Sequence, residues 1–135
     1  MPFGYTGKIL HVDLTRRKIE TEEPDETFYR SYLGGRGIGY YYLLRDVPAH
    51  TDSLAPENIL VLATGVMTGS PIAASCRFAA VGKSPLTGTA GESEAAGFFG
   101  PELKAAGFDA VVFKGRSETP VYLWVTDGRA EIRDA

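Results

Sequence analysis

The stretch TGSPIAASCRFAAVGKSPLTGTAGESEAAGFFGPELKAAG, residues 68–107, decides how this chain folds and what it can bind. It opens with a loop of small residues, Gly69–Ser75, and continues into a short apolar strand expected at Phe78–Val81. A Ser-Pro turn, a second small-residue loop at Thr87–Gly97 and a short helix at Pro101–Ala106 follow. Loops of Gly, Ala and Ser let a ligand approach the backbone closely, because no bulky side chain blocks it.

Arg77 lies between the two loops and is the first candidate for a ligand contact. Its planar guanidinium suits a phosphate or the edge of a heteroaromatic ring, so the stretch predicts a surface for a flat anionic ligand. The alternative is an ion pair with Glu92, Glu94 or Glu102. The neighbouring Cys76 is either a reactive thiol or a small packed side chain.

Carboxylates are few near these loops. Glu92 and Glu94 are two residues apart, so in an extended loop they share a side and could hold a divalent cation or act as acid and base. The alternative is that both are solvated. Asp13 and Asp109 adjoin apolar segments and are expected to be structural, and His11 is expected to be solvated or paired across a strand.

The segments before this stretch predict a β-hairpin and two short helices. Lys8–Leu14 and Lys18–Thr21 have strand patterns on either side of a turn. Asp25 can cap a helix that stops at Gly34-Gly35, and a second helix is expected at Tyr40–Arg45. Gly34–Gly37, with Arg36 in it, is either a tight corner between helices or a backbone patch for an anion.

Further strands complete the pattern of an α+β, sheet-rich domain with short helices. Ile59–Ala63 and Ala110–Phe113 are continuous apolar runs, which predicts strands buried on both faces. Val121–Val125 and Ala130–Ile132 flank Asp127-Gly128, the strongest hairpin signal in the chain.

Composition limits the classes of function. The 135 residues are expected to form a single domain, 1–135, or part of one, and 44% of them are hydrophobic. A net charge of −3 argues against nucleic acid as a partner. One cysteine cannot by itself hold an iron–sulfur cluster. The first residues have no signal-peptide pattern and no apolar run reaches about 18 residues, so we expect a cytoplasmic protein without a membrane segment.

Seven motifs occur in an order that resembles one known family. They are GYTGKILHVDLT (4–15), YLGGRG (32–37), LAPEN (54–58), ATGVMTG (63–69), KSPLTG (83–88), GFFGPELKAAGFD (97–109), and PVYL with EIRDA (120–135). Together they resemble the N-terminal domain of the tungsten-containing aldehyde:ferredoxin oxidoreductase family. The resemblance is collinear and covers nearly the whole chain. It implies that the domain, 1–135, is part of a longer enzyme and incomplete at its C-terminus.

The resemblance implies a domain whose β-sheets form a base under a tungsten bis-pterin cofactor, with molybdenum as the alternative metal. It places the family's arginine between pterin and iron–sulfur cluster on Arg77. It implies further contacts, mainly through the backbone, from Ser75, Cys76, Ala95, Ala96 and Gly97. The backbone carbonyl of Glu94 would bind the magnesium that bridges the pterin phosphates. Glu94 departs from the Asn expected there, and added negative charge beside phosphates is unfavourable unless it faces the cation.

The resemblance also implies a function: oxidation of aldehydes to carboxylic acids, with ferredoxin as electron acceptor. The 4Fe-4S cluster would be held by parts of the enzyme outside this chain. The isolated chain is therefore expected to be inactive without the remainder of the enzyme or a completing subunit. A sister enzyme that reduces aromatic acyl thioesters is an alternative. Another is a free-standing, non-catalytic interaction module, pairing with a partner or a second copy through Tyr40–Tyr42 or a strand edge near Ile132.

Overall fold

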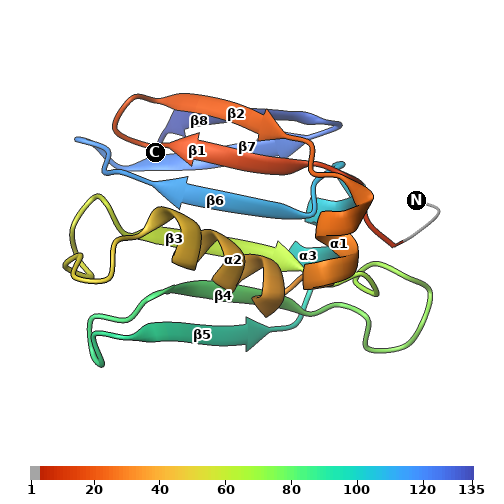
Figure 1. The fold of residues 1–135 in the computed structure, drawn as a ribbon. Coiled ribbons are helices and arrows are strands. Elements are labelled where there is room, and N and C mark those ends of the chain that lie inside the picture. The colour runs from red at the N-terminus through yellow and green to blue at the C-terminus, as the bar shows by residue number, and fades with distance from the viewer. Residues whose placement is uncertain (1–3) are drawn as a thin grey trace.

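The computed structural model describes residues 4–135 (Figure 1). Its sheet and short helices confirm the expected α+β class. In chain order the elements are β1 (Ile9–Asp13), β2 (Lys18–Glu22), α1 (Glu26–Tyr32), α2 (Arg36–Asp46), β3 (Ile59–Thr64), β4 (Phe78–Lys83), β5 (Ala90–Ala95), α3 (Phe99–Ala105), β6 (Ala110–Lys114), β7 (Val121–Thr126) and β8 (Arg129–Asp134).

The main sheet has six strands in the order β2-β1-β6-β3-β4-β5. β1 and β6 pair in parallel, with Ile9 opposite Ala110, and the other neighbouring strands are antiparallel. The parallel pair brings together segments that lie about a hundred residues apart in the sequence. As a result the N-terminal hairpin β1–β2 extends one side of the sheet, while β3–β4–β5 form the other side.

Helices α1 and α2 cover one face of this sheet, as Figure 1 shows for α2 across β3 and β4. Alternate strand residues point into this layer because side chains alternate across a strand. Tyr42 is completely buried there, and Tyr40 and Tyr41 are partly buried against the same core. The buried members of the cluster are Ile9, Tyr29, Ile38, Tyr42, Leu43, Ile59, Val61, Ala63, Ala79, Val81, Ala110 and Val112.

The opposite face is covered by α3 and by the β7–β8 hairpin, which lies behind β1, β2 and β6 in Figure 1. Leu10, Val12, Leu103, Phe108 and Val111 are buried in this second cluster. The cover does not extend over all of β3, where Leu60 remains 47% exposed. The expectation that Ile59–Ala63 is buried on both faces is therefore wrong for Leu60, and Leu62 is only partly buried. In β6, Ala110–Val112 is buried on both faces.

The ends of α1 and α2 match the expectation in part. The Asp25 carboxylate accepts a hydrogen bond from the Phe28 N–H at 2.9 Å, which confirms the predicted cap. The left-handed C-cap residue is Leu33, one position before the two glycines. The second helix begins at Arg36, with Gly35 as its N-cap residue, so Arg36–Gly39 form its first turn ahead of the expected Tyr40–Arg45.

The largest local correction concerns the second small-residue loop. Residues Ala90–Ala95 within it form β5, an edge strand paired with β4 along its whole length. Their sequence, AGESEA, has low strand propensity. Pairing with a neighbouring strand overrides that local preference, a contribution that no window of sequence contains.

The C-terminal hairpin forms as expected. Asp127 and Gly128 both have positive φ, 45° and 76°, as a type I′ turn requires. Trp124 is half-buried, and the Arg133 guanidinium lies 4.1 Å from the centre of its indole ring.

Candidate ligand-binding site

The first small-residue loop follows β3 and is closed by its own hydrogen bonds. The Thr68 hydroxyl accepts from the Gly65 N–H at 3.0 Å and donates to the Arg77 carbonyl at 2.7 Å. The Gly69 N–H donates to the Ser75 carbonyl at 2.8 Å. These hydrogen bonds restrain the backbone on both sides of the loop, and with it the backbone of Arg77.

A buried lysine donates a hydrogen bond to the backbone at the start of the same loop. The Lys104 ammonium donates to the Gly65 carbonyl at 2.5 Å and to the Gly4 carbonyl. Burial lowers the pKa of Lys104. Nearby, the buried Asp109 carboxylate accepts from the Thr6 and Gly7 N–H groups, which confirms its structural role. Sequence reasoning missed Lys104, because a lysine in a short helix usually faces solvent.

Arg77 meets a carboxylate of β5 and, through it, a second arginine. Its Nη1 lies 3.4 Å from Glu94 Oε2, and Arg36 Nη2 lies 2.7 Å from Glu94 Oε1. Arg36 Nη1 also lies 3.1 Å from Glu92 Oε1. The Arg36 guanidinium holds the pKa of the Glu94 carboxyl below its usual range. This confirms the expected ion-pair alternative for Arg77, with Glu94 as its partner.

The two glutamates are therefore partners of arginines. Within residues 4–135, no group of three or more His, Cys, Asp or Glu side chains comes together in a way that could hold a metal ion. His11 pairs across the hairpin with Glu22, at 2.7 Å between Nε2 and Oε2, as predicted. Asp13 accepts a hydrogen bond from the Arg16 N–H, in keeping with the structural role predicted for it.

A cavity of about 280 Å³ opens beside these ion pairs. Gly35 and Gly65 line it together with Ser75, Arg77 and Glu94, and its other lining residues are Met67, Thr68, Ala74, Phe78 and Ala79. The structure thus brings together three of the seven residues expected at the site. The Ser75 hydroxyl donates within its own loop, to the Ser70 or Ile72 carbonyl at 2.6 and 2.7 Å.

The other four expected residues lie outside the lining of this cavity. Cys76 is a half-buried free thiol next to Arg77. Ala95 pairs with Phe78, so the end of β5 lies beside the base of the arginine, and Ala96 and Gly97 follow it. Ala95, Ala96 and Gly97 are exposed. They form an open surface of small residues next to the cavity, with their backbone accessible to a ligand.

This arrangement can bind and orient an anion. Small residues leave the backbone open, and two guanidiniums lie at one edge. Glu92 and Glu94 balance the charges of Arg36 and Arg77, so the donors left for a ligand are mainly those of Arg77, whose side chain is 68% exposed. The arrangement supplies binding, and the reacting groups would come from the ligand or from another chain segment.

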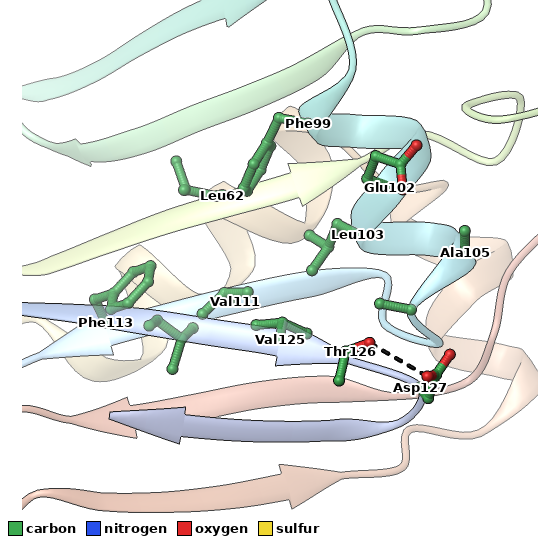
Figure 2. A pocket seen from close by; sticks show the side chains of 12 residues that line it. Leu62, Phe99, Glu102, Leu103, Ala105, Val111, Phe113, Val125, Thr126 and Asp127 are labelled. Atoms are coloured by element: carbon green, nitrogen blue, oxygen red, sulfur yellow. Dashed lines mark hydrogen bonds between the residues drawn. The ribbon is translucent and has the colours of Figure 1, made fainter. Parts of the chain in front are cut away.

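A second cavity, of about 530 Å³, lies on the opposite side of the sheet (Figure 2). Figure 2 shows Leu62 and Val111 on the sheet facing α3, with Val125 of β7 beside them. Its polar groups are confined to Glu102, Thr126, Asp127 and the backbone. Such an apolar groove suits packing against another protein segment better than binding an anion.

Residues 9–135 match the family model described as "Aldehyde ferredoxin oxidoreductase, N-terminal domain". The chain belongs to this family. Its relatives include the tungsten-containing aldehyde ferredoxin oxidoreductase of Pyrococcus abyssi, 45% identical over 133 residues, which cover 98% of this chain and 22% of the relative.

Other similar proteins have names that point to different substrates. The aliphatic sulfonate oxidoreductase, WOR-like subunit, of Pyrococcus furiosus is 38% identical over 136 residues, covering 98% of this chain and 22% of the relative. Among solved structures, the active site complex BamBC of benzoyl coenzyme A reductase with 1,5 dienoyl-CoA matches with a TM-score of 0.95. It is 38% identical, and the match covers 98% of this chain and 20% of that chain.

The chain spans about a fifth of the length of the curated relatives it matches. These relatives are oxidoreductases by name. In the described part of the chain, every helix is too short or too polar to cross a membrane.

Proposed function

We propose that residues 1–135 form the cofactor-binding N-terminal unit of a cytoplasmic oxidoreductase that oxidises aldehydes to carboxylic acids and passes electrons to ferredoxin. The cofactor would be a tungsten or molybdenum bis-pterin. The observation that carries the proposal is the position of Arg77. Its backbone is held by the Thr68 hydroxyl, and its side chain lines the cavity between two accessible small-residue segments.

The residues present fit such a group. A Cβ added at Gly35 or Gly97 would meet nothing within 4 Å, so the backbone there is open to a flat ligand. Two guanidiniums provide donors for phosphate oxygens. When bound, the metal-pterin group supplies the oxidation–reduction chemistry. Arg77 would place a positive charge against the pterin, while Ser75, Cys76, Ala95, Ala96 and Gly97 would offer backbone groups.

Magnesium and the 4Fe-4S cluster belong to the same proposal. Glu94 would bind magnesium through its backbone carbonyl. Its carboxylate lies beside the guanidiniums of Arg36 and Arg77, and these two positive charges lower the repulsion between Glu94 and nearby phosphates. Cys76 is the single cysteine, so the cluster ligands would come from the remainder of the enzyme or a completing subunit.

The test is the metal and pterin content of the full-length protein that carries this chain. We expect Arg77→Gln to lower both severalfold relative to wild type, because the substitution removes a charged donor next to the cofactor. Arg30→Gln on α1, which breaks an exposed pair with Glu26, serves as the matched control and should load normally. Full loading of Arg77→Gln would show that Arg77 has no part in holding the cofactor.

A second candidate is reduction of an aromatic acyl thioester. The fold match to the benzoyl coenzyme A reductase complex, at a TM-score of 0.95, favours it. The two activities share this domain, so substrate assays must separate them. Turnover of benzoyl-CoA or its dienoyl product by the full-length protein, with no turnover of aldehydes, would favour the reductase.

The non-catalytic interaction module remains a third candidate, favoured by the apolar groove in Figure 2. Of the surfaces expected for it, the tyrosine face is reduced, because Tyr42 is completely buried. The strand edge near Ile132 is present: in the described residues β8 pairs with β7 alone, while the Ile132 side chain packs against the second core cluster. A full-length polypeptide of about 135 residues that sediments as a dimer would favour this candidate over an enzyme.

A further inference from the structure

The Glu94 carboxylate bridges two guanidiniums that come from different parts of the chain. Arg36 is the first residue of α2 and contacts Oε1, and Arg77 precedes β4 and contacts Oε2. The carboxylate thus occupies the position in which one anion touches both arginines. A phosphate has the same capacity, since two of its oxygens can each accept from a guanidinium.

The two contacts differ in strength. Arg36 is 2.7 Å from Glu94, whereas the 3.4 Å contact to Arg77 is longer than charge-assisted hydrogen bonds of about 2.7–2.9 Å. Among the described residues, Arg77 forms an ion pair with Glu94 alone, and the Arg77 side chain is 68% exposed. Arg77 therefore has donors to spare for a second anion.

Glu92 keeps Arg36 in place independently of Glu94. Its carboxylate lies 3.1 Å from Arg36 Nη1, while Glu94 uses Nη2. If the exposed Glu94 side chain turned away, Arg36 would still be oriented by Glu92. The network therefore contains one carboxylate that positions the arginine and another that can leave it.

We propose that Arg36 and Arg77 form a two-arginine site for a phosphate group, in which Glu94 holds the place that the phosphate takes on binding. The inference rests on the proposed function, because the phosphate is that of the pterin cofactor. It adds Arg36 as a binding residue. It also has the Glu94 carboxylate compete with the phosphate for the two arginines, a role separate from any role of the Glu94 backbone carbonyl.

The first test uses inorganic pyrophosphate as the probe, titrated into the full-length protein from cells unable to make the pterin. Isothermal titration at constant ionic strength compares wild type with Arg36→Gln, Arg77→Gln and Glu94→Gln. Since an exposed charge contact contributes little, we expect each arginine variant to bind about three- to fivefold more weakly. Glu94→Gln should bind tighter by a similar factor.

Arg30→Gln controls for the loss of one positive charge elsewhere on the surface. Arg36→Gln binding like wild type would overturn the two-arginine site. Glu94→Gln binding no tighter than wild type would overturn the competitor role. An equal loss in Arg30→Gln would reduce the effect to net charge and would also overturn the site.

The second test measures pterin content in protein from pterin-making cells, and it separates the source of the phosphate. Lower content in Arg36→Gln than in Arg30→Gln supports the cofactor phosphate. Normal content, with weakened pyrophosphate binding, assigns the site to a free phosphate compound and overturns the cofactor as its ligand. Wild-type protein without any pterin would overturn the proposed function, while the pyrophosphate result would still decide the arginine site.

Discussion

At the scale of single residues, Asp109 makes the most consequential contacts. Its carboxylate is buried and accepts from the N–H groups of Thr6 and Gly7 at 2.8–2.9 Å, and from the Thr6 hydroxyl. It thereby fixes the segment before β1 next to the start of β6. An asparagine in its place would keep one acceptor oxygen and would turn its NH₂ group towards at least one of these donors.

We therefore expect Asp109→Asn to lower the free energy of unfolding by about 2–3 kcal/mol, because buried donors lose a charged acceptor. Urea unfolding followed by circular dichroism measures it. Asp134→Asn is the control, since its pair with Arg17 is exposed and should contribute less than about 1 kcal/mol. Equal stability of the Asp109 variant and wild type would contradict this role for the carboxylate.

Two buried tyrosines predict how stability changes at alkaline pH. Burial raises the pKa of Tyr29 and of Tyr42 far above the ordinary value of 10.0. A raised folded pKa contributes stability that is complete below pH 10 and is lost as pH rises above it, because the unfolded chain releases protons that the folded chain keeps. The loss approaches about 1.4 kcal/mol per pH unit for each residue. Lys104, with its lowered pKa, opposes this loss only up to its ordinary pKa of 10.5.

Absorbance at 295 nm during alkaline titration checks this expectation. Of the seven tyrosines, Tyr29 and Tyr42 should ionise only together with unfolding, as seen by circular dichroism. In Tyr29→Phe one of the two late signals should disappear. Ionisation of all tyrosines before any loss of structure would contradict the burial of these two hydroxyls.

At the scale of elements, the packing of α2 on the sheet depends on Gly39. A Cβ at this position would lie 2.4 Å from Val81 Cγ2 and 2.7 Å from Val81 Cβ. The glycine therefore lets the helix approach β4 closely. The hydrophobic core on this face depends on that approach, since Ile38, Tyr42 and Val81 are all buried in it.

We expect Gly39→Ala to destabilise the chain by about 1–3 kcal/mol through overpacking, although alanine favours helices by up to about 1 kcal/mol. Adding Val81→Ala should recover part of the loss, so that the double variant is more stable than the sum of the single effects predicts. Leu44→Ala, at a 79% exposed position of α2, is the neutral control. Chemical unfolding measures all four, and a Gly39→Ala variant more stable than wild type would refute the close approach.

At the scale of the whole molecule, the sheet is covered by α1 and α2 on one face, and by α3 and the β7–β8 hairpin on the other. The β7–β8 hairpin belongs to a separate two-stranded sheet and is held by side chains such as Leu123, Val125 and Ile132 against the second cluster. A two-stranded hairpin has marginal stability by itself, so its order depends on this contact.

We expect Ile132→Asn to release the hairpin while the six-stranded sheet persists. Hydrogen exchange should then show faster exchange at β7 and β8, with protection kept in β3 and β4. Glu131→Gln, on the same strand with an exposed side chain, should exchange like wild type. Uniform loss of protection throughout the chain would instead mean that hairpin and sheet unfold as one unit.

The sequence by itself determined the features that depend on a few consecutive residues. These are the Asp25 cap, the Asp127-Gly128 turn, the apolar strands and the place of Arg77 between two small-residue loops. The seven motifs in their order predicted the family, and the comparisons confirm it.

The contacts between distant segments follow from the three-dimensional fold alone. They are the β1–β6 pairing, the pairing that makes β5 a strand, the hydrogen bonds of Lys104 and the contact of Arg36 with Glu94, 58 residues away. The physical reason is that local propensity acts within a few residues. Pairing and ion contacts depend on which strands the whole fold places side by side.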